Sequence, residues 1–151
     1  MRITTIFVAI LLLPFFIGCA ENNPFGTVYV EGTVTMDGEP IEGVHVTFMP
    51  RDPGADLSAG GITNASGRFT LTAGGSPAGS GAVPGSYDVT FSKLEHAIPP
   101  PLEGRPRVFH LPGPTYLVPQ RYESPSTSNI EPVTVSTNRR ENVFTFDLTS
   151  Q

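Results

Sequence analysis

Strict alternation of apolar and polar residues is the feature that most constrains the fold of this chain. From residue 27 to 36, the side chains of Val28, Val30, Val34 and Met36 share one parity, and polar side chains occupy the other. A period of two places alternate side chains on opposite faces of a β-strand. The pattern predicts a strand with one face in the core and one in water.

The same alternation returns five more times, separated by turn residues. Asp37-Gly38, Asn64-Ala65-Ser66-Gly67 and residues 138–141 are typical turn segments, and Gly67 is expected at positive φ. The last of these turns predicts a closing hairpin between residues 133–135 and 144–148. The predicted core consists of Val28, Val30, Val34, Val44, Val46, Phe48, Phe69, Leu71, Tyr87, Val89, Phe91, Val135, Phe144, Phe146 and Leu148.

About seven short strands with turns between them and no helical period indicate an all-β chain, folded as a single Greek-key β-sandwich. We assign residues 27–151 to this domain and interpret residues 95–119, which hold seven prolines, as an irregular insertion with a short edge strand near residues 107–111. The net charge of −5 and a single lysine, Lys93, argue against nucleic acid as a partner.

The N-terminus is typical of an export signal. Arg2 is followed by twelve residues, Ile6–Ile17, that are apolar apart from a proline, and then by Gly18 and Cys19. This run is shorter than the ~18–20 residues that a membrane-spanning helix needs. We therefore interpret residues 1–18 as a lipoprotein signal peptide, Cys19 as the acylated residue and residues 19–26 as a tether. Cleavage after Ala20, which would release a soluble secreted binding module, is the alternative.

Several motifs resemble those of one family. Residues 30–44, 63–69 and 83–89 are similar to the first two strands, a tight turn and a later strand of carboxypeptidase regulatory-like domains, which are transthyretin-like sandwiches. Residues 119–122, 127–130 and 142–148 resemble a bacterial lipoprotein branch of that family. The resemblance implies a lipoprotein of the cell envelope that faces the periplasm or the exterior. It implies little about activity, because the shared residues are structural.

Catalytic constellations known on this fold are missing from the sequence. The transthyretin-related hydrolases close with a Tyr-Arg-Gly-Ser tail and the intradiol dioxygenases carry a His-x-His pair, whereas the three histidines here are isolated. The nearest arrangement to a site is Arg107 and His110 beside Tyr116 and Tyr122, which we interpret as a polar patch. We expect no enzyme, no cofactor and no metal site. A metal-dependent or hydrolytic enzyme of the transthyretin-like fold is the alternative.

What remains is a structural or binding role. The insertion and the residues after it carry more apolar surface than a loop needs, and Phe109, Tyr116 and Tyr122 are the candidate binding residues. The expected partners are the membrane, through lipid on Cys19, and a glycan or an envelope protein. Whether the two tyrosines pack on the domain or stay exposed decides between structure and binding.

Overall fold

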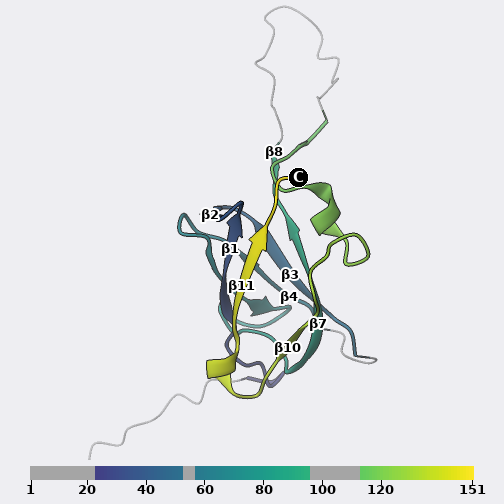
Figure 1. Cartoon of the computed structure of the whole chain (residues 1–151). Coiled ribbons are helices and arrows are strands. Elements are labelled where there is room, and N and C mark those ends of the chain that lie inside the picture. Colours follow the sequence, from purple (N-terminus) through teal and green to yellow (C-terminus); the bar gives the residue numbers. More distant parts are fainter. Residues whose placement is uncertain (1–22, 53–56, 96–112) are drawn as a thin grey trace, which may run out of the picture.

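The computed structural model describes residues 23–52, 57–95 and 113–151, and it is all-β (Figure 1). Two short 3₁₀ turns are the only helical elements in these ranges. The signal peptide, Cys19 and the expected edge strand near residues 107–111 lie outside the described residues. The strands are β1 (Glu31–Met36), β2 (Glu39–Pro40), β3 (His45–Pro50), β4 (Ala59–Ile62), β5 (Arg68–Thr70), β6 (Thr72–Ala73), β7 (Gly85–Ser92), β8 (Leu94–Glu95), β9 (Thr115–Tyr116), β10 (Val133–Val135) and β11 (Val143–Leu148).

The strands form two main sheets and one small ribbon. One sheet has the order β11-β1-β2, with β5 also paired to β1, and the other has the order β10-β7-β3-β4-β6. Strands β8 and β9 form the ribbon by themselves. All pairings are antiparallel except β1 with β11, which is parallel. The architecture is β-sandwich-like, in agreement with the coarser part of the predicted fold.

The core lies between the two main sheets and is rich in aromatic side chains. Phe48 of β3 lies within 6.4 Å of four other rings, measured between centroids, and Phe91 of β7 meets Phe146 of β11 at 5.0 Å. Aromatic pairs at these distances stabilise a core beyond the burial of their area. Of the fifteen predicted core residues, thirteen are buried, and Val28 and Phe144 are partly buried.

The tight turn at residues 64–67 is confirmed. Asn64 Oδ1 accepts hydrogen bonds from Ser66 N and Arg68 N, each at 3.0 Å, and Gly67 has φ +72°. A Cβ at Gly67 would lie 2.4 Å from Val34 O. Both the backbone angle and this close approach require glycine at the position.

The predicted closing hairpin is wrong. Strand β10 pairs with β7, whereas β11 pairs with β1 in the opposite sheet. The 3₁₀ turn η2 (Arg139–Glu141) therefore carries the chain from one sheet to the other instead of closing a hairpin. The predicted first strand also begins later, at Glu31, because Val28 makes only an isolated bridge to Ala82.

Candidate binding surface

The structure separates the residues that we expected to share a binding surface. Tyr116 lies in β9 and is 41% exposed. Tyr122 lies in the 3₁₀ turn η1 (Gln120–Glu123) and is 6% exposed. Phe109 and His110 lie outside the described residues. The two tyrosines therefore differ in environment: Tyr116 is exposed, whereas Tyr122 is buried.

Tyr116 belongs to an exposed apolar cluster on the ribbon. Leu94 of β8 lies opposite Tyr116 in the antiparallel register, and directly opposed side chains share a face. Leu117, which follows in the chain, is also exposed, and its N–H donates to Lys93 O at 2.9 Å. We call Leu94, Tyr116 and Leu117 the ribbon patch. Leu94 and Tyr116 lie on the strand pair and Leu117 directly follows it, so three large exposed apolar side chains lie on or next to one small element.

Tyr122 anchors the segment that follows the ribbon. Its ring meets Phe91 edge to face, with 6.4 Å between centroids, and Val118 beside it is also buried. The phenol oxygen accepts a hydrogen bond from Thr149 N at 3.0 Å, just beyond the end of β11. Through these contacts the η1 segment is joined to both main sheets.

Arg121 completes this anchor. Its guanidinium lies 4.7 Å from the centroid of the Tyr122 ring and donates to Thr149 O and, at 2.8 Å, to Thr149 Oγ1. Burial alone would raise the pKa of Tyr122, but the hydrogen bonds from Thr149 and Arg121 favour the phenolate and leave that pKa below its ordinary value. The cluster is a structural clamp, since the Tyr122 phenol and the Arg121 guanidinium are both hydrogen-bonded to Thr149.

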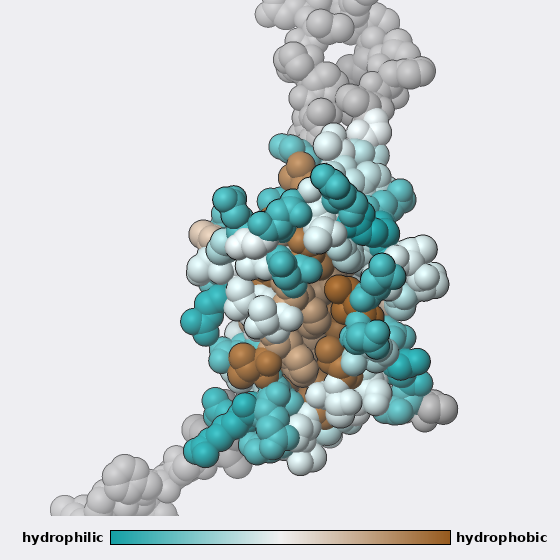
Figure 2. Space-filling model, viewed as in Figure 1, coloured by the Kyte–Doolittle hydropathy of each residue, from teal (hydrophilic) through white to brown (hydrophobic). Residues whose placement is uncertain are grey.

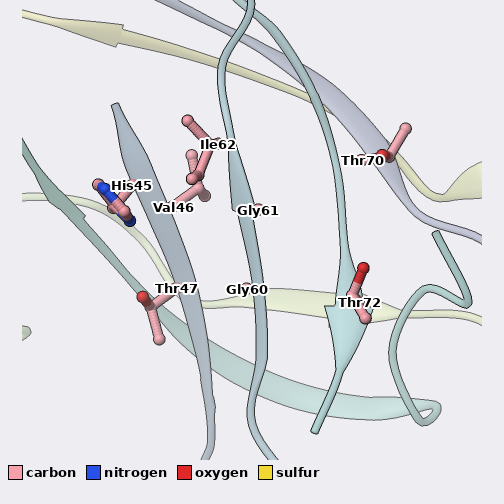
Figure 3. Close-up of a pocket in the computed structure, with 8 residues that line it drawn as sticks. All are labelled: His45, Val46, Thr47, Gly60, Gly61, Ile62, Thr70 and Thr72. Carbon is pink, nitrogen blue, oxygen red and sulfur yellow. The ribbon is translucent and has the colours of Figure 1, made fainter. Parts of the chain in front are cut away.

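A shallow hollow lies on the sheet that contains β3 and β4 (Figure 3). It is lined by His45, Val46, Thr47, Gly60, Gly61, Ile62, Thr70 and Thr72. The hollow offers hydroxyl groups and one imidazole and contains no carboxylate. Within the described residues, no group of three histidine, cysteine, aspartate or glutamate side chains is placed to hold a metal ion.

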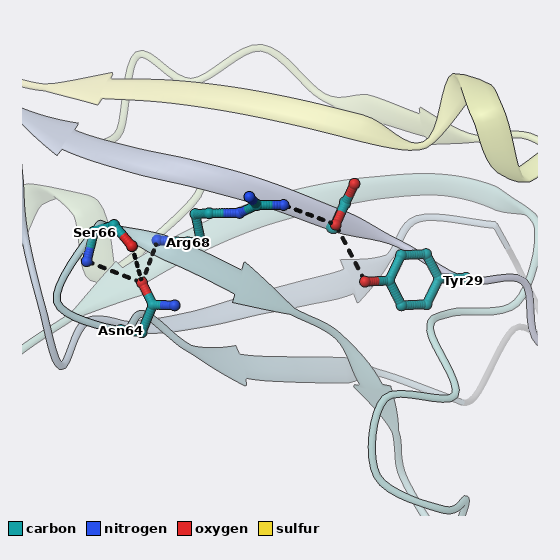
Figure 4. A network of polar contacts seen from close by, with 5 residues as sticks. Tyr29, Asn64, Ser66 and Arg68 are labelled. Atoms are coloured by element: carbon teal, nitrogen blue, oxygen red, sulfur yellow. Dashed lines mark hydrogen bonds and ion pairs between the residues drawn. The ribbon is translucent and has the colours of Figure 1, made fainter.

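The outer face of the other sheet carries a polar network (Figure 4). Glu31 Oε2 accepts a hydrogen bond from Tyr29 OH at 3.1 Å and pairs with the Arg68 guanidinium at 3.3 Å. Partial burial, together with the nearby Glu31 carboxylate, raises the pKa of Tyr29. The groups are paired with one another on a solvated surface, so they contribute little stability and present no reactive group.

Asn142 is a key residue that the sequence did not identify. It is fully buried, its Oδ1 accepts from Ser136 N, and its Nδ2 donates to Ser136 O, both at 2.8 Å. These bonds fix the crossing from β10 to β11. An asparagine beside a turn is common at solvated positions, so nothing in the local sequence signals this burial.

In comparisons with family models, with curated proteins and with solved structures, nothing matches this chain. Within the part of the chain that the structure describes, no helix is both long enough and apolar enough to cross a membrane. The functional interpretation of the ribbon patch therefore rests on the structure of this chain alone.

Proposed function

We propose that this protein is a non-catalytic binding module of the cell envelope, held on a membrane by lipid on Cys19. The observation that carries the binding role is the ribbon patch, where Leu94 lies opposite Tyr116 and both are exposed, as is Leu117 next to them. Exposed apolar side chains gathered in one place favour contact with a partner, because their burial releases ordered water and stabilises the complex. The expected localisation faces the periplasm or the exterior.

An envelope protein suits the ribbon patch better than a glycan does. Two of the three side chains are leucines, which offer no hydrogen bonds to sugar hydroxyls. The phenol oxygen of Tyr116 already accepts a weak hydrogen bond from Gln120 Nε2 at 3.4 Å. The partner surface we expect is apolar and ringed by polar groups.

The proposed fold assignment is a Greek-key sandwich of the carboxypeptidase regulatory-like, transthyretin-like kind in a bacterial lipoprotein. Its support is the set of sequence motifs, together with a β-sandwich-like architecture in which the Asn64–Gly67 turn has the expected geometry. This assignment favours a structural or binding role, because the shared motifs consist of turn and core residues.

The anchor is tested by Cys19→Ser. Wild-type chain should partition into the detergent phase and carry acyl mass on Cys19, and the variant should lose both. A mature N-terminus at Glu21 in the wild-type protein would contradict the anchor and favour a secreted protein.

The binding role is tested by photo-cross-linking in intact cells. A photoreactive residue at position 117 should give one discrete cross-linked product, whereas the same residue at position 62 should give none. Ile62 is the matched control, since it is an exposed apolar residue (57%) on a different sheet. Equal products from both positions would contradict the proposal. Stoichiometric iron or zinc that is lost in a Tyr116→Ala variant would favour an enzyme instead.

A further inference from the structure

The described chain begins at one end of the sandwich, beside η2. Tyr29 O accepts a hydrogen bond from Asn142 Nδ2 at 3.4 Å, and the Arg139 guanidinium lies 5.4 Å from the centroid of the Tyr29 ring. Figure 1 shows η2 at this end of the sandwich and β8 of the ribbon at the other. We call these two regions the η2 end and the ribbon end.

The short tether keeps the η2 end close to the proposed lipid. Three residues separate Cys19 from Asn23, so at full extension this piece of chain spans only about 14 Å. Strand β7 runs from Gly85, which pairs with Val135 shortly before η2, to Ser92 next to the ribbon, and eight residues of strand span about 26 Å. The η2 end therefore stays within reach of a membrane that holds Cys19, and the ribbon end lies a strand's length further along the domain.

Among the described residues, those of the ribbon end are mainly acidic. The charged side chains here lie in β2, β8 and η1, in the turns on either side of β2, and near the ends of β7 and β11. They comprise six carboxylates and two basic groups. The acidic residues are Asp37, Glu39, Glu42, Glu95, Glu123 and Asp147, and the basic residues are Lys93 and Arg121. The negative surface of an anionic membrane repels this end of the domain.

The η2 end carries exposed cations and an exposed aromatic ring. Arg139 and Arg140 are both exposed in η2, and Arg140 forms no ion pair with a residue of the described ranges. The neighbouring carboxylate, that of Glu141, accepts a hydrogen bond from Asn138 Nδ2 at 2.8 Å. Phe25, which is 45% exposed, lies in the turn at the start of the described chain. Figure 2, viewed as in Figure 1, shows hydrophilic side chains over η2 at this end of the sandwich.

The other charged groups in this half of the sandwich are engaged within the chain. Arg68 pairs with Glu31 at 3.3 Å, and Arg51 pairs with Asp88 at 3.4 Å. Asp52 Oδ2 accepts a hydrogen bond from a backbone N–H at 3.1 Å. Together with the charged groups of η2, these make four charges of each sign, so the described part of this half is neutral where the ribbon end is acidic. The difference favours the η2 end as the side that approaches an anionic surface.

We propose that the η2 end rests on the headgroups of an anionic membrane. Arg139 and Arg140 lie against lipid phosphates, and the Phe25 ring lies at the boundary between headgroups and acyl chains. This inference rests on the proposed function, because it requires lipid on Cys19. It also deepens that function, since the ribbon patch then points away from the membrane that holds the chain and towards a partner in the surrounding space.

The lipid on Cys19 supplies the affinity for the membrane, and the charges of the domain supply its orientation. Each arginine beside an anionic surface favours the docked orientation about 5-fold, and this attraction falls off over about 8 Å at physiological salt. The contact of Arg139 with the Tyr29 ring holds that side chain at the η2 end and leaves its charge in place. If the domain turns over, the carboxylates of the ribbon end meet the same surface and are repelled.

The test uses the acylated chain, purified from membranes and placed in vesicles of phosphatidylcholine with about one-third phosphatidylglycerol. A fluorescent residue at position 25 or at position 94 reports contact with a spin-labelled lipid headgroup through the quenching of its fluorescence. The two positions are matched, since Phe25 is 45% and Leu94 is 43% exposed. Because a strand of about 26 Å separates the two ends, quenching at position 25 should exceed that at position 94 at least ~3-fold.

Arg140→Gln separates the effect of charge from that of the tether. The variant should lower the quenching at position 25 at least ~2-fold, because one of the two η2 cations is lost. Lys93→Gln is the matched control, since it removes the same charge at the ribbon end, and it should change that quenching by less than ~20%. In vesicles of phosphatidylcholine alone, the difference between positions 25 and 94 should fall to the level of Arg140→Gln or below.

Mass spectrometry of Cys19 distinguishes this proposal from the one on which it rests. A wild-type chain without acyl mass would overturn the lipid anchor and this proposal together. An acylated chain with equal quenching at positions 25 and 94 would overturn the orientation alone. Unchanged quenching in Arg140→Gln, or an equal difference between the two positions in vesicles without anionic lipid, would likewise overturn the contact of η2 with anionic headgroups.

Discussion

Tyr116 and Tyr122 lie six residues apart in the sequence and have opposite environments. Tyr116 sits in a strand of two residues whose only partner is another strand of two residues. Tyr122 sits in η1, packs on Phe91 and accepts a hydrogen bond from Thr149 N. The comparison shows that distant parts of the chain, β7 and the end of β11, decide which tyrosine is buried.

The largest expected effect on stability comes from changing the buried tyrosine, Tyr122. Tyr122→Ala removes a ring from the core and leaves Thr149 N–H without its acceptor, so we expect the free energy of unfolding to fall by about 3–5 kcal/mol. Urea denaturation measures this loss. A decrease of under ~1 kcal/mol would show that η1 is not an anchor.

Tyr122→Phe separates the ring from its hydroxyl group. The phenylalanine ring keeps the contact with Phe91, but Thr149 N–H and the Arg121 guanidinium lose the phenol oxygen. We expect a loss of about 1 kcal/mol by the same denaturation measurement. Tyr116→Phe is the matched control and should leave the unfolding midpoint unchanged.

The pH dependence of the free energy of unfolding at acidic pH tests a further contact at the end of β11. Asp37 Oδ1 accepts from Ser150 N at 3.2 Å, and hydrogen bonds from Ser150 hold the pKa of Asp37 below its ordinary 3.8. Because the folded pKa is the lower one, this stabilisation is present above about pH 4 and is lost as pH falls through the folded pKa. Asp37→Asn should flatten this part of the pH profile, and an unchanged profile would contradict the contact.

The smallest expected effect on stability comes from changing the exposed tyrosine, Tyr116. Tyr116→Ala removes a ring that makes no core contact, so the unfolding free energy should change by less than about 0.5 kcal/mol. A loss near that of Tyr122→Ala would mean that the ribbon is part of the folded core.

Much of the fold followed from the sequence because strand alternation is a local property. Val46, Phe69 and Val89 were placed in the core by parity alone, and each is buried. Gly67 was placed at positive φ from its position in the turn, and it has φ +72°. In these cases neighbouring residues carry the information.

The pairing of β10 and β11 could not be obtained in this way. A turn between two apolar runs is compatible both with a hairpin and with a crossing between sheets. The crossing is fixed by buried Asn142 and by the pairing of β11 with β1, more than one hundred residues away in the sequence. For the same reason the sequence did not distinguish Tyr116 from Tyr122.

We propose that Tyr116 contributes to binding a partner, whereas Tyr122 stabilises the fold. The most direct measurement is cross-linking from a photoreactive residue at position 117 in intact cells, with and without Tyr116→Ala. We predict that Tyr116→Ala lowers the cross-linked yield at least ~10-fold while the unfolding midpoint stays unchanged. An undiminished yield, or a yield that falls only together with the unfolding midpoint, would contradict the claim.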